Sequence, residues 1–226
     1  MVSVVNIKKT YNSKTVIEDL SLSVNAGDLA VIVGPSGCGK STLLNIIAGL
    51  DQNYEGNLQT SGQKIGYVFQ EDRILPWLTV FQNIKSVNPS GEDALVQHFI
   101  DAAGLTGFEK YYPDELSGGM RQRCSIARAL YYGSDILLMD EPFKSLDYVI
   151  RQKMISDLLK IHKEEKNTIL FVTHDIEEAL AVADTVFVLR KDPCRLADTI
   201  NMKTKSPWSA EKKQQLKEKI LKLIAA

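Results

Sequence analysis

A glycine-rich run that follows an apolar stretch constrains the fold of this chain more than any other feature. The run is Gly34, Pro35, Ser36, Gly37, Cys38, Gly39, Lys40, Ser41 and Thr42, directly after apolar residues 29–33. It fits the pattern G-x-x-x-x-G-K-[ST], a loop that wraps the phosphates of a nucleotide between a strand and a helix. Glycines lack the Cβ atoms that would keep backbone N–H groups from turning inward, so these groups can line a nest for anions. The run therefore predicts nucleotide binding.

The loop also suggests chemistry for three side chains. A helix that begins near Lys40 adds a partial positive charge of about +0.5 at its N-terminus, which favours bound phosphate. Lys40 is expected to reach the β- and γ-phosphates, and the Ser41 hydroxyl is expected to ligate Mg²⁺. The positive potential should lower the pKa of the Cys38 thiol. We therefore expect thiol alkylation to inactivate the protein and bound nucleotide to protect it.

Composition and charge exclude several classes of protein. The 226 residues are 44% hydrophobic and 24% charged, with a net charge of −1, which gives no overall attraction to nucleic acid. No nucleic-acid partner is expected. No apolar stretch is long enough to cross a bilayer and no signal peptide begins the chain, so we expect a cytoplasmic location. The widely spaced Cys38, Cys124 and Cys194 predict neither a disulfide framework nor a zinc site.

Short β-branched runs alternate with helical patterns, which is typical of an α/β protein with a mostly parallel sheet. The expected strands are residues 2–7, 20–24, 29–33, 64–69, 136–139, 168–173 and 185–189. Between 69 and 136 only helical spacing remains, at Val80, Phe81 and Ile84, at Leu95, Phe99 and Ala102, and at Ile126 and Leu130. This stretch predicts a helical subdomain inserted into the α/β core.

The C-terminal tail predicts an amphipathic helix. Ser206 and Pro207 suit the N-cap and the first helical position. The apolar residues of one face, among several lysines, are Leu216, Ile220, Leu223 and Ile224. We expect this face to pack on the core, and contact with a membrane is the alternative.

Six further motifs carry a resemblance to a known family. Residues 116–123 (LSGGMRQR) are similar to the LSGGQ signature of ABC-type ATPases, with Met120 in place of the usual glutamine. Residues 136–142 (ILLMDEP) resemble their Walker B strand, and residues 145–147 (SLD) resemble their D-loop. His174 resembles the switch histidine, Gln70 the Q-loop and Tyr11 the A-loop aromatic. The chain is thus identified as a member of this family over residues 2 to about 195.

The resemblance implies a single ABC ATPase domain over residues 1–226, with ATP and Mg²⁺ as cofactors. Its P-loop NTPase (RecA-like) core would comprise residues 1–70 and 134–226, with an N-terminal antiparallel β region. The inserted helical subdomain would comprise residues 71 to 133, approximately.

The resemblance also assigns catalytic roles. Asp140 and Glu141 end an apolar strand, and the carboxyl ends of parallel strands face the ligand crevice of such a sheet. Asp140 is expected to hold Mg²⁺ through water and Glu141 to polarise the attacking water. An acidic pair that merely starts a turn is the alternative. Gln70 would offer its amide oxygen to the metal or the water, His174 would hydrogen-bond the γ-phosphate, and Tyr11 would stack on adenine.

The signature motif implies a dimer. Ser117, Gly118 and Gly119 precede a helix and offer a second anion site without a lysine. In the family this site contacts the γ-phosphate held by the phosphate loop of a second copy, and Asp147 lies where the copies meet. A homodimer with two shared ATP sites is therefore expected.

Residues 70–80 (QEDRILPWLTV) narrow the resemblance to one group of import cassettes. They are similar to a stretch in the cassettes for nitrate, sulfonates, taurine and bicarbonate, where this region receives a helix of the membrane subunit. Pro76 and Trp77 would supply rigid apolar contacts there, and packing in the helical subdomain is the alternative for Trp77.

The group implies the ATP-hydrolysing subunit of an ABC importer, peripheral on the cytoplasmic face of the cell membrane. Its partners would be membrane-spanning permease subunits and, indirectly, an extracytoplasmic substrate-binding protein. The solute stays open among sulfonate, nitrate, taurine, bicarbonate and a thiamine precursor. The alternative function is a soluble ABC-type ATPase not coupled to transport.

Overall fold

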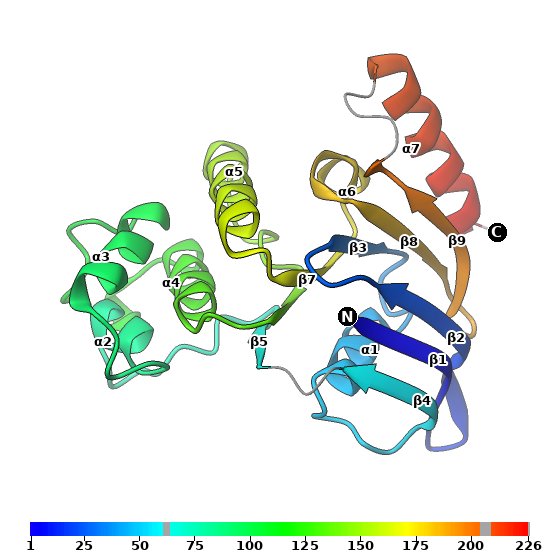
Figure 1. Ribbon diagram of the computed structural model, residues 1–226, viewed down its shortest axis with the longest axis horizontal. Helices are drawn as coiled ribbons and strands as arrows, with labels where there is room; N and C mark the ends of the chain where they lie inside the picture. The colour runs from blue at the N-terminus through cyan, green and yellow to red at the C-terminus, as the bar shows by residue number, and fades with distance from the viewer. Residues whose placement is uncertain (61–63, 204–208, 226) are drawn as a thin grey trace. The chain divides into compact units, whose positions relative to one another are not determined.

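The structure is a computed structural model that describes residues 1–60, 64–203 and 209–225 (Figure 1). Its contacts divide the chain into two compact units, Met1–Gln63 with Lys166–Ala226, and Lys64–Glu165. Each unit combines strands with helices. The expected α/β class, with mostly parallel strands and an N-terminal antiparallel region, is confirmed.

The antiparallel region belongs to the first unit and has the strand order β2–β1–β4. The strands are β1 (Val2–Tyr11), β2 (Lys14–Val24) and β4 (Glu55–Thr60). Asn12 and Ser13 have φ angles of 45° and 68°, which suit a tight two-residue hairpin turn. Because this turn lets Tyr11 pair with Lys14, both strands are longer than the expected ranges 2–7 and 20–24. The polar strand β4 was not expected.

The parallel strands of the first unit centre on β3 (Leu29–Val33). This strand lies between β7 (Thr168–Thr173) and β8 (Thr185–Arg190), both parallel to it, and β9 (Arg195–Asn201) joins β8 in antiparallel fashion. Every residue of β3 and β7 is buried, which explains their continuous apolar runs. The expected bounds of β3 and β7 are confirmed, whereas β9 was not expected.

The first unit has three helices in the described residues: α1 (Lys40–Ile47), α6 (Ile176–Val182) and α7 (Ala210–Ala225). Helix α7 lies along β8 and β9 (Figure 1). Its Ile220 is fully buried and Leu216 is 8% exposed, so the expected packing of the tail on the core is confirmed. The expected helix start at residues 206 and 207 lies outside the described residues.

The second unit holds the parallel pair β5 (Ile65–Val68) and β6 (Ile136–Asp140). Its helices are α2 (Val80–Lys85), α3 (Asp93–Ala102), the 3₁₀ helix η1 (Pro113–Glu115), α4 (Gly118–Tyr131) and α5 (Tyr148–Glu165). Both strands match the expected ranges to within two residues.

Helices α2, α3 and α4 pack around a shared apolar core. Ile84, Ile100 and Cys124 are fully buried in it, and Phe99 meets Tyr131 edge to face with ring centroids 6.1 Å apart. Residues 69–135 are all described and contain helices and loops but no strand. The second unit is larger than the expected subdomain, since it also includes β5, β6 and α5. The boundaries near 71 and 133 therefore stay a prediction.

Candidate functional site

The glycine-rich loop joins β3 to α1, and its glycines are required by the backbone and by packing. Gly37 and Gly39 have φ angles of 73° and 108°, a region that L side chains rarely adopt. A Cβ atom at Gly34 would come within 2.9 Å of the Leu189 carbonyl oxygen. One at Gly39 would come within 3.1 Å of the Val16 side chain. Larger residues at these positions would distort the loop.

The N-terminus of α1 is open to an anion. Its N-cap residue is Gly39, which has no side chain to cap the first backbone amides, and its first turn contains no acidic residue. Lys40 is 5% exposed, and its Nζ donates to the carbonyl oxygens of Gly34 and Pro35, at 2.9 Å each. Ser41 follows on an exposed position. Uncapped amides and a buried ammonium group together make an electropositive cradle that fits phosphate.

Cys38 is buried in the loop beside a second cysteine. Cys38 is 2% exposed and Cys194 is 1% exposed. The Cys194 N–H donates to the Val16 carbonyl at 2.9 Å, which ties this cysteine to β2. A hydrogen bond with Cys194 lowers the pKa of Cys38, Lys40 acts in the same direction, and the same thiol pair raises the pKa of Cys194. The expected lowering of the Cys38 pKa is confirmed, but its largest cause is the hydrogen bond with Cys194. The Cys38 thiol is also shielded from solvent.

Two other predicted nucleotide contacts lie at strand ends of the first unit. Tyr11 is the last residue of β1 and is 47% exposed. His174 follows β7 and is exposed. The turn around it is fixed because the Asp175 N–H donates to the Thr173 hydroxyl at 3.0 Å and the Asp175 side chain caps α6.

The second unit places the acidic pair at the carboxyl end of β6. Asp140 ends the strand and is 5% exposed, and Glu141 follows it. Glu141 has a φ angle of 45°, an uncommon value for a non-glycine residue that tends to occur at functional sites. Its side chain is 11% exposed, and Lys144 Nζ lies 2.9 Å from its Oε2. A carboxylate held in this way can polarise a water molecule.

Gln70 and the loop after it lie on the surface of the second unit. Gln70 is exposed. Trp77 is 69% exposed, so the alternative in which it packs in the helical core is wrong. The fully buried Asn83 fixes this loop, because its Nδ2 donates to the carbonyl oxygens of Leu75 and Leu78 at 3.0 and 2.9 Å.

The signature residues begin α4. Ser117 is its N-cap and accepts a hydrogen bond from the Met120 N–H at 3.3 Å. Ser117 and Gly118 are exposed, and Gly119 is partly buried. Asp147 stands before α5, and its Oδ1 accepts from the Ile150 N–H at 3.0 Å. Both segments are therefore locally ordered and open to solvent.

The predicted residues fall into two sets. The first unit carries Tyr11, the glycine-rich loop and His174, and the second carries Gln70, Ser117–Gly119, Asp140, Glu141 and Asp147. Hydroxyl, amide and carboxylate oxygens are donors that suit Mg²⁺. In the part of the chain that the structure describes, no cluster of three or more His, Cys, Asp or Glu side chains could hold a metal ion.

Three neighbours of these residues were not found from the sequence. Lys9 and Asp51 contact Tyr11, and Cys194 contacts Cys38. Of the three, only Lys9 could be found from the sequence, because its i, i+2 spacing from Tyr11 puts both residues on one face of β1. The other two approach from distant parts of the chain.

No helix within residues 1–60, 64–203 and 209–225 combines the length and the apolar character that crossing a bilayer requires.

Comparison with protein families identifies the family. The model of the ABC transporter family matches residues 17–144, which include the glycine-rich loop, Gln70, the signature and the acidic pair.

Curated relatives cover nearly the whole chain. One is the aliphatic sulfonates import ATP-binding protein SsuB of Bacillus cereus, 39% identical over 97% of this chain and 94% of the relative. Another is the aliphatic sulfonates import ATP-binding protein SsuB 2 of Pseudomonas syringae pv. tomato. It is 42% identical over 88% of this chain and 87% of the relative.

Solved structures with the same fold include the ATP-binding cassette MJ0796 in a dimeric, post-hydrolysis state bound to ADP and Pi. That structure is 29% identical, with a TM-score of 0.79, and the match covers 89% of this chain and 99% of that one. A second dimeric structure of MJ0796, described as a bacterial ABC transporter cassette, has a TM-score of 0.80 at 28% identity.

Proposed function

Since the chain belongs to the ABC transporter family and is an ABC-type ATPase, we propose that it powers an importer of aliphatic sulfonates. The observation that carries this proposal is the identity of about 40% over most of the chain to subunits named for aliphatic sulfonate import. The loop after Gln70, with its exposed Trp77, favours the same group.

The first unit would bind the nucleotide. The amides of the glycine-rich loop, Gly34 to Thr42, would hold the phosphates, with the ammonium group of Lys40 already directed at the loop. The Ser41 hydroxyl would be a ligand of Mg²⁺. Tyr11 would stack on the base, and His174 would hydrogen-bond the γ-phosphate.

The second unit would supply the hydrolytic groups. Asp140 and Gln70 would hold Mg²⁺, directly or through water, and Glu141 would take the proton of the attacking water. Mg²⁺ held by these residues would supply positive charge that offsets the negative charge of the phosphate oxygens. Because the transition state is mainly stabilised by charge, Lys40 and His174 would act through electrostatic stabilisation.

A second copy of the chain would complete each site. Ser117, Gly118 and Gly119 at the start of α4 would contact the γ-phosphate held by the partner's loop, with Asp147 near the junction. The exposed positions of Ser117, Gly118 and Asp147 and the dimeric state of the similar cassettes support this arrangement. An isologous dimer would then contain two equivalent ATP sites.

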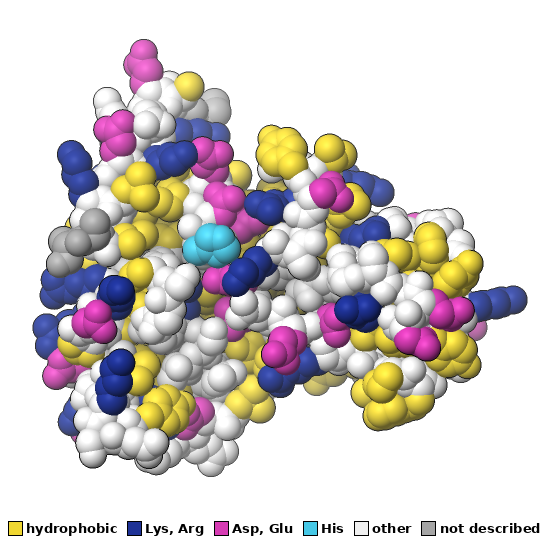
Figure 2. Space-filling view, turned by 180° about the vertical axis from the view of Figure 1, so that it is seen from behind, with side chains coloured by type: hydrophobic (Ala, Val, Ile, Leu, Met, Phe, Trp, Pro, Cys, Tyr) yellow, Lys and Arg dark blue, Asp and Glu magenta, His cyan; other side chains and the backbone are white. Residues whose placement is uncertain are grey.

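The proposed assembly lies on the cytoplasmic face of the cell membrane. Its permease subunits would contact the loop after Gln70, which carries Trp77. An extracytoplasmic binding protein would deliver the solute to the permease. No nucleic-acid partner is proposed. On the face seen in Figure 2, Lys and Arg side chains are interspersed with Asp and Glu instead of forming one basic stripe.

Two measurements test the proposal. The chain is purified from its host in mild detergent and its partners are identified by mass spectrometry, and uptake of a labelled alkanesulfonate is compared in cells with and without it. A co-purifying multi-span permease and uptake that depends on the chain support the proposal. Exclusively soluble partners and unchanged uptake would instead favour an ATPase uncoupled from transport.

A further inference from the structure

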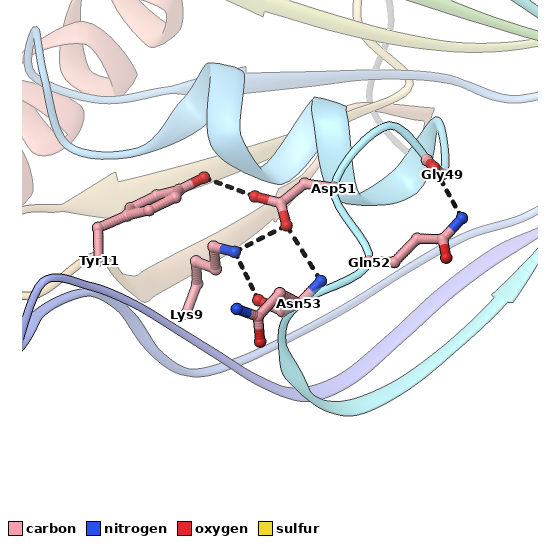
Figure 3. Close-up of polar contacts among 6 residues, drawn as sticks. All are labelled: Lys9, Tyr11, Gly49, Asp51, Gln52 and Asn53. Atoms are coloured by element: carbon pink, nitrogen blue, oxygen red, sulfur yellow. Dashed lines mark hydrogen bonds and ion pairs between the residues drawn. The ribbon is translucent and has the colours of Figure 1, made fainter.

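The side chain of Tyr11 is held at its hydroxyl and covered on one ring face (Figure 3). Its hydroxyl donates to Asp51 Oδ2 at 2.5 Å. Lys9 Nζ lies 4.4 Å from the centroid of the tyrosine ring, in cation–π geometry. Tyr11 is still 47% exposed, so much of the side chain remains available to a ligand.

Asp51 is itself fixed by several contacts. Its Oδ1 accepts from Lys9 Nζ at 2.7 Å and from the Asn53 N–H at 3.1 Å. Lys9 Nζ also donates to the Asn53 carbonyl at 2.5 Å. The Lys9 side chain is 2% exposed and that of Asp51 is 18% exposed. The four residues form a connected network with little freedom to rearrange (Figure 3).

The network also connects Tyr11 to the phosphate loop through one helix. Asp51 follows α1, and its N–H donates to the Asn45 carbonyl in the last turns of that helix at 3.2 Å. The first residue of α1 is Lys40, so the same rigid element carries the phosphate cradle at one end and the anchor of Tyr11 at the other.

The protonation states agree with this arrangement. The hydrogen bond from Lys9 lowers the pKa of Asp51, and the hydrogen bond to Asp51 raises the pKa of Tyr11. At neutral pH the carboxylate is therefore an acceptor and the phenol a donor.

We propose that Asp51 and Lys9 are positioning residues for the nucleotide base. Asp51 fixes the orientation of the Tyr11 ring relative to the phosphate loop. Lys9 covers one face of the ring, so a purine stacks on the opposite face. This inference rests on the proposed function, in which Tyr11 contacts the base.

The test separates base binding from phosphate binding. The affinities of Mg·ADP and Mg·pyrophosphate are measured by calorimetry on the full chain, since neither probe requires the hydrolytic step. The variants are Tyr11→Ala, Tyr11→Phe, Asp51→Ala and the double variant Tyr11→Phe/Asp51→Ala. Gln52→Ala is the matched control, because Gln52 is adjacent to Asp51, exposed and bonded only to the Gly49 carbonyl in Figure 3.

Loss of the stacked ring in Tyr11→Ala should weaken ADP binding by about 5- to 150-fold. Tyr11→Phe and Asp51→Ala should weaken it by about 3- to 10-fold, because the ring remains but is no longer oriented. The double variant should lose no more ADP affinity than Asp51→Ala, since each single change already removes the Tyr11–Asp51 hydrogen bond. Pyrophosphate affinity should stay within about twofold in every variant, and Gln52→Ala should bind both probes normally.

Normal ADP affinity in both Tyr11→Phe and Asp51→Ala would overturn the positioning role, as would an equal loss of ADP and pyrophosphate affinity. Asp51→Ala could fail to fold because Lys9 loses its partner. In that case the ADP and pyrophosphate affinities of Tyr11→Phe test the positioning role, since this variant leaves the Lys9–Asp51 pair intact. Wild-type protein that binds neither probe would contradict the proposed function itself, which is a different result from either of these.

Discussion

Glu141 combines a left-handed backbone, a nearly buried carboxylate and a position directly after the buried Asp140. A general base needs a defined position and limited solvation, and both are provided here by the end of β6. Strained backbone of this kind tends to persist at functional sites, which favours a functional reason for it here.

Glu141→Gln should therefore retain nucleotide binding and lose ATP hydrolysis by about 10²- to 10³-fold, because the amide cannot accept the proton of water. Phosphate release and Mg·ADP affinity measure the two properties separately. Glu92→Gln is the control, since Glu92 is exposed and makes no capping hydrogen bond at α3. Hydrolysis at the wild-type rate in Glu141→Gln would rule out its role as the base.

Cys38 should be the cysteine whose alkylation inactivates the ATPase. Its lowered pKa means that the reactive thiolate forms at lower pH than in a free cysteine, so inactivation should speed up as pH rises and level off below the usual range near 8.5. In contrast, burial raises the pKa of Cys124 to about 12. The rate of ATPase inactivation by iodoacetamide, followed between pH 6 and 9 with and without ADP, measures this pH dependence.

Bound ADP should protect Cys38, and Cys38→Ala should resist inactivation. Because the thiol is 2% exposed, the reaction should be slower than with a free thiol. Inactivation that persists in Cys38→Ala, or that is independent of pH, would assign the effect to another group.

At the scale of elements, α7 shows how an amphipathic pattern becomes a packed helix. Ile220 is fully buried and Leu216 nearly so, whereas the lysines between them remain toward solvent. Lys219 Nζ also pairs with Asp198 of β9 at 2.5 Å. Apolar burial is the main stabilising contribution, since exposed ion pairs contribute little.

Ile220→Ala should lower the free energy of unfolding by about 2–5 kcal/mol, because it removes a fully buried side chain and leaves a cavity. Leu221→Ala is the matched control, since the adjacent Leu221 is 49% exposed and should change stability by less than about 0.5 kcal/mol. Urea unfolding followed by circular dichroism measures both. Equal effects of the two substitutions would contradict the packing of α7 on the core.

At the scale of the whole molecule, the residues proposed for one reaction come from both units and from a second copy of the chain. The phosphate loop and the signature each lie at a helix N-terminus, but Ser117 caps the second, whereas the first has a glycine N-cap and a buried lysine. This difference supports a division of labour in which the loop binds the phosphates and the signature contacts them from the partner.

ATP should therefore cause dimerisation when hydrolysis is blocked. Glu141→Gln with Mg·ATP should elute at twice the 25.2 kDa of one chain in size exclusion with light scattering. Ser117→Arg in the same background should stay monomeric yet bind Mg·ADP normally, because its own phosphate loop is intact. A monomer in both proteins would refute the shared-site arrangement.

Local sequence determined the buried strands and the phosphate loop of this protein. Buried strands such as β3 and β7 are continuous apolar runs, and the glycines of the phosphate loop follow from backbone geometry, so both could be predicted. Strands β4 and β9 could not, because their polar residues carry no strand pattern and pairing with a neighbour defines them.

Only the tertiary structure decided which side chains support the site. Asp51 reaches Lys9 and Tyr11 across about 40 residues of chain, and Cys194 reaches Cys38 across a still longer separation. It also decided that Trp77 is exposed and that Asn83 is buried beneath its loop. Sequence specifies motifs whose chemistry lies within a few consecutive residues. Contacts between distant segments, and the burial that shifts pKa values, exist only once the chain has folded.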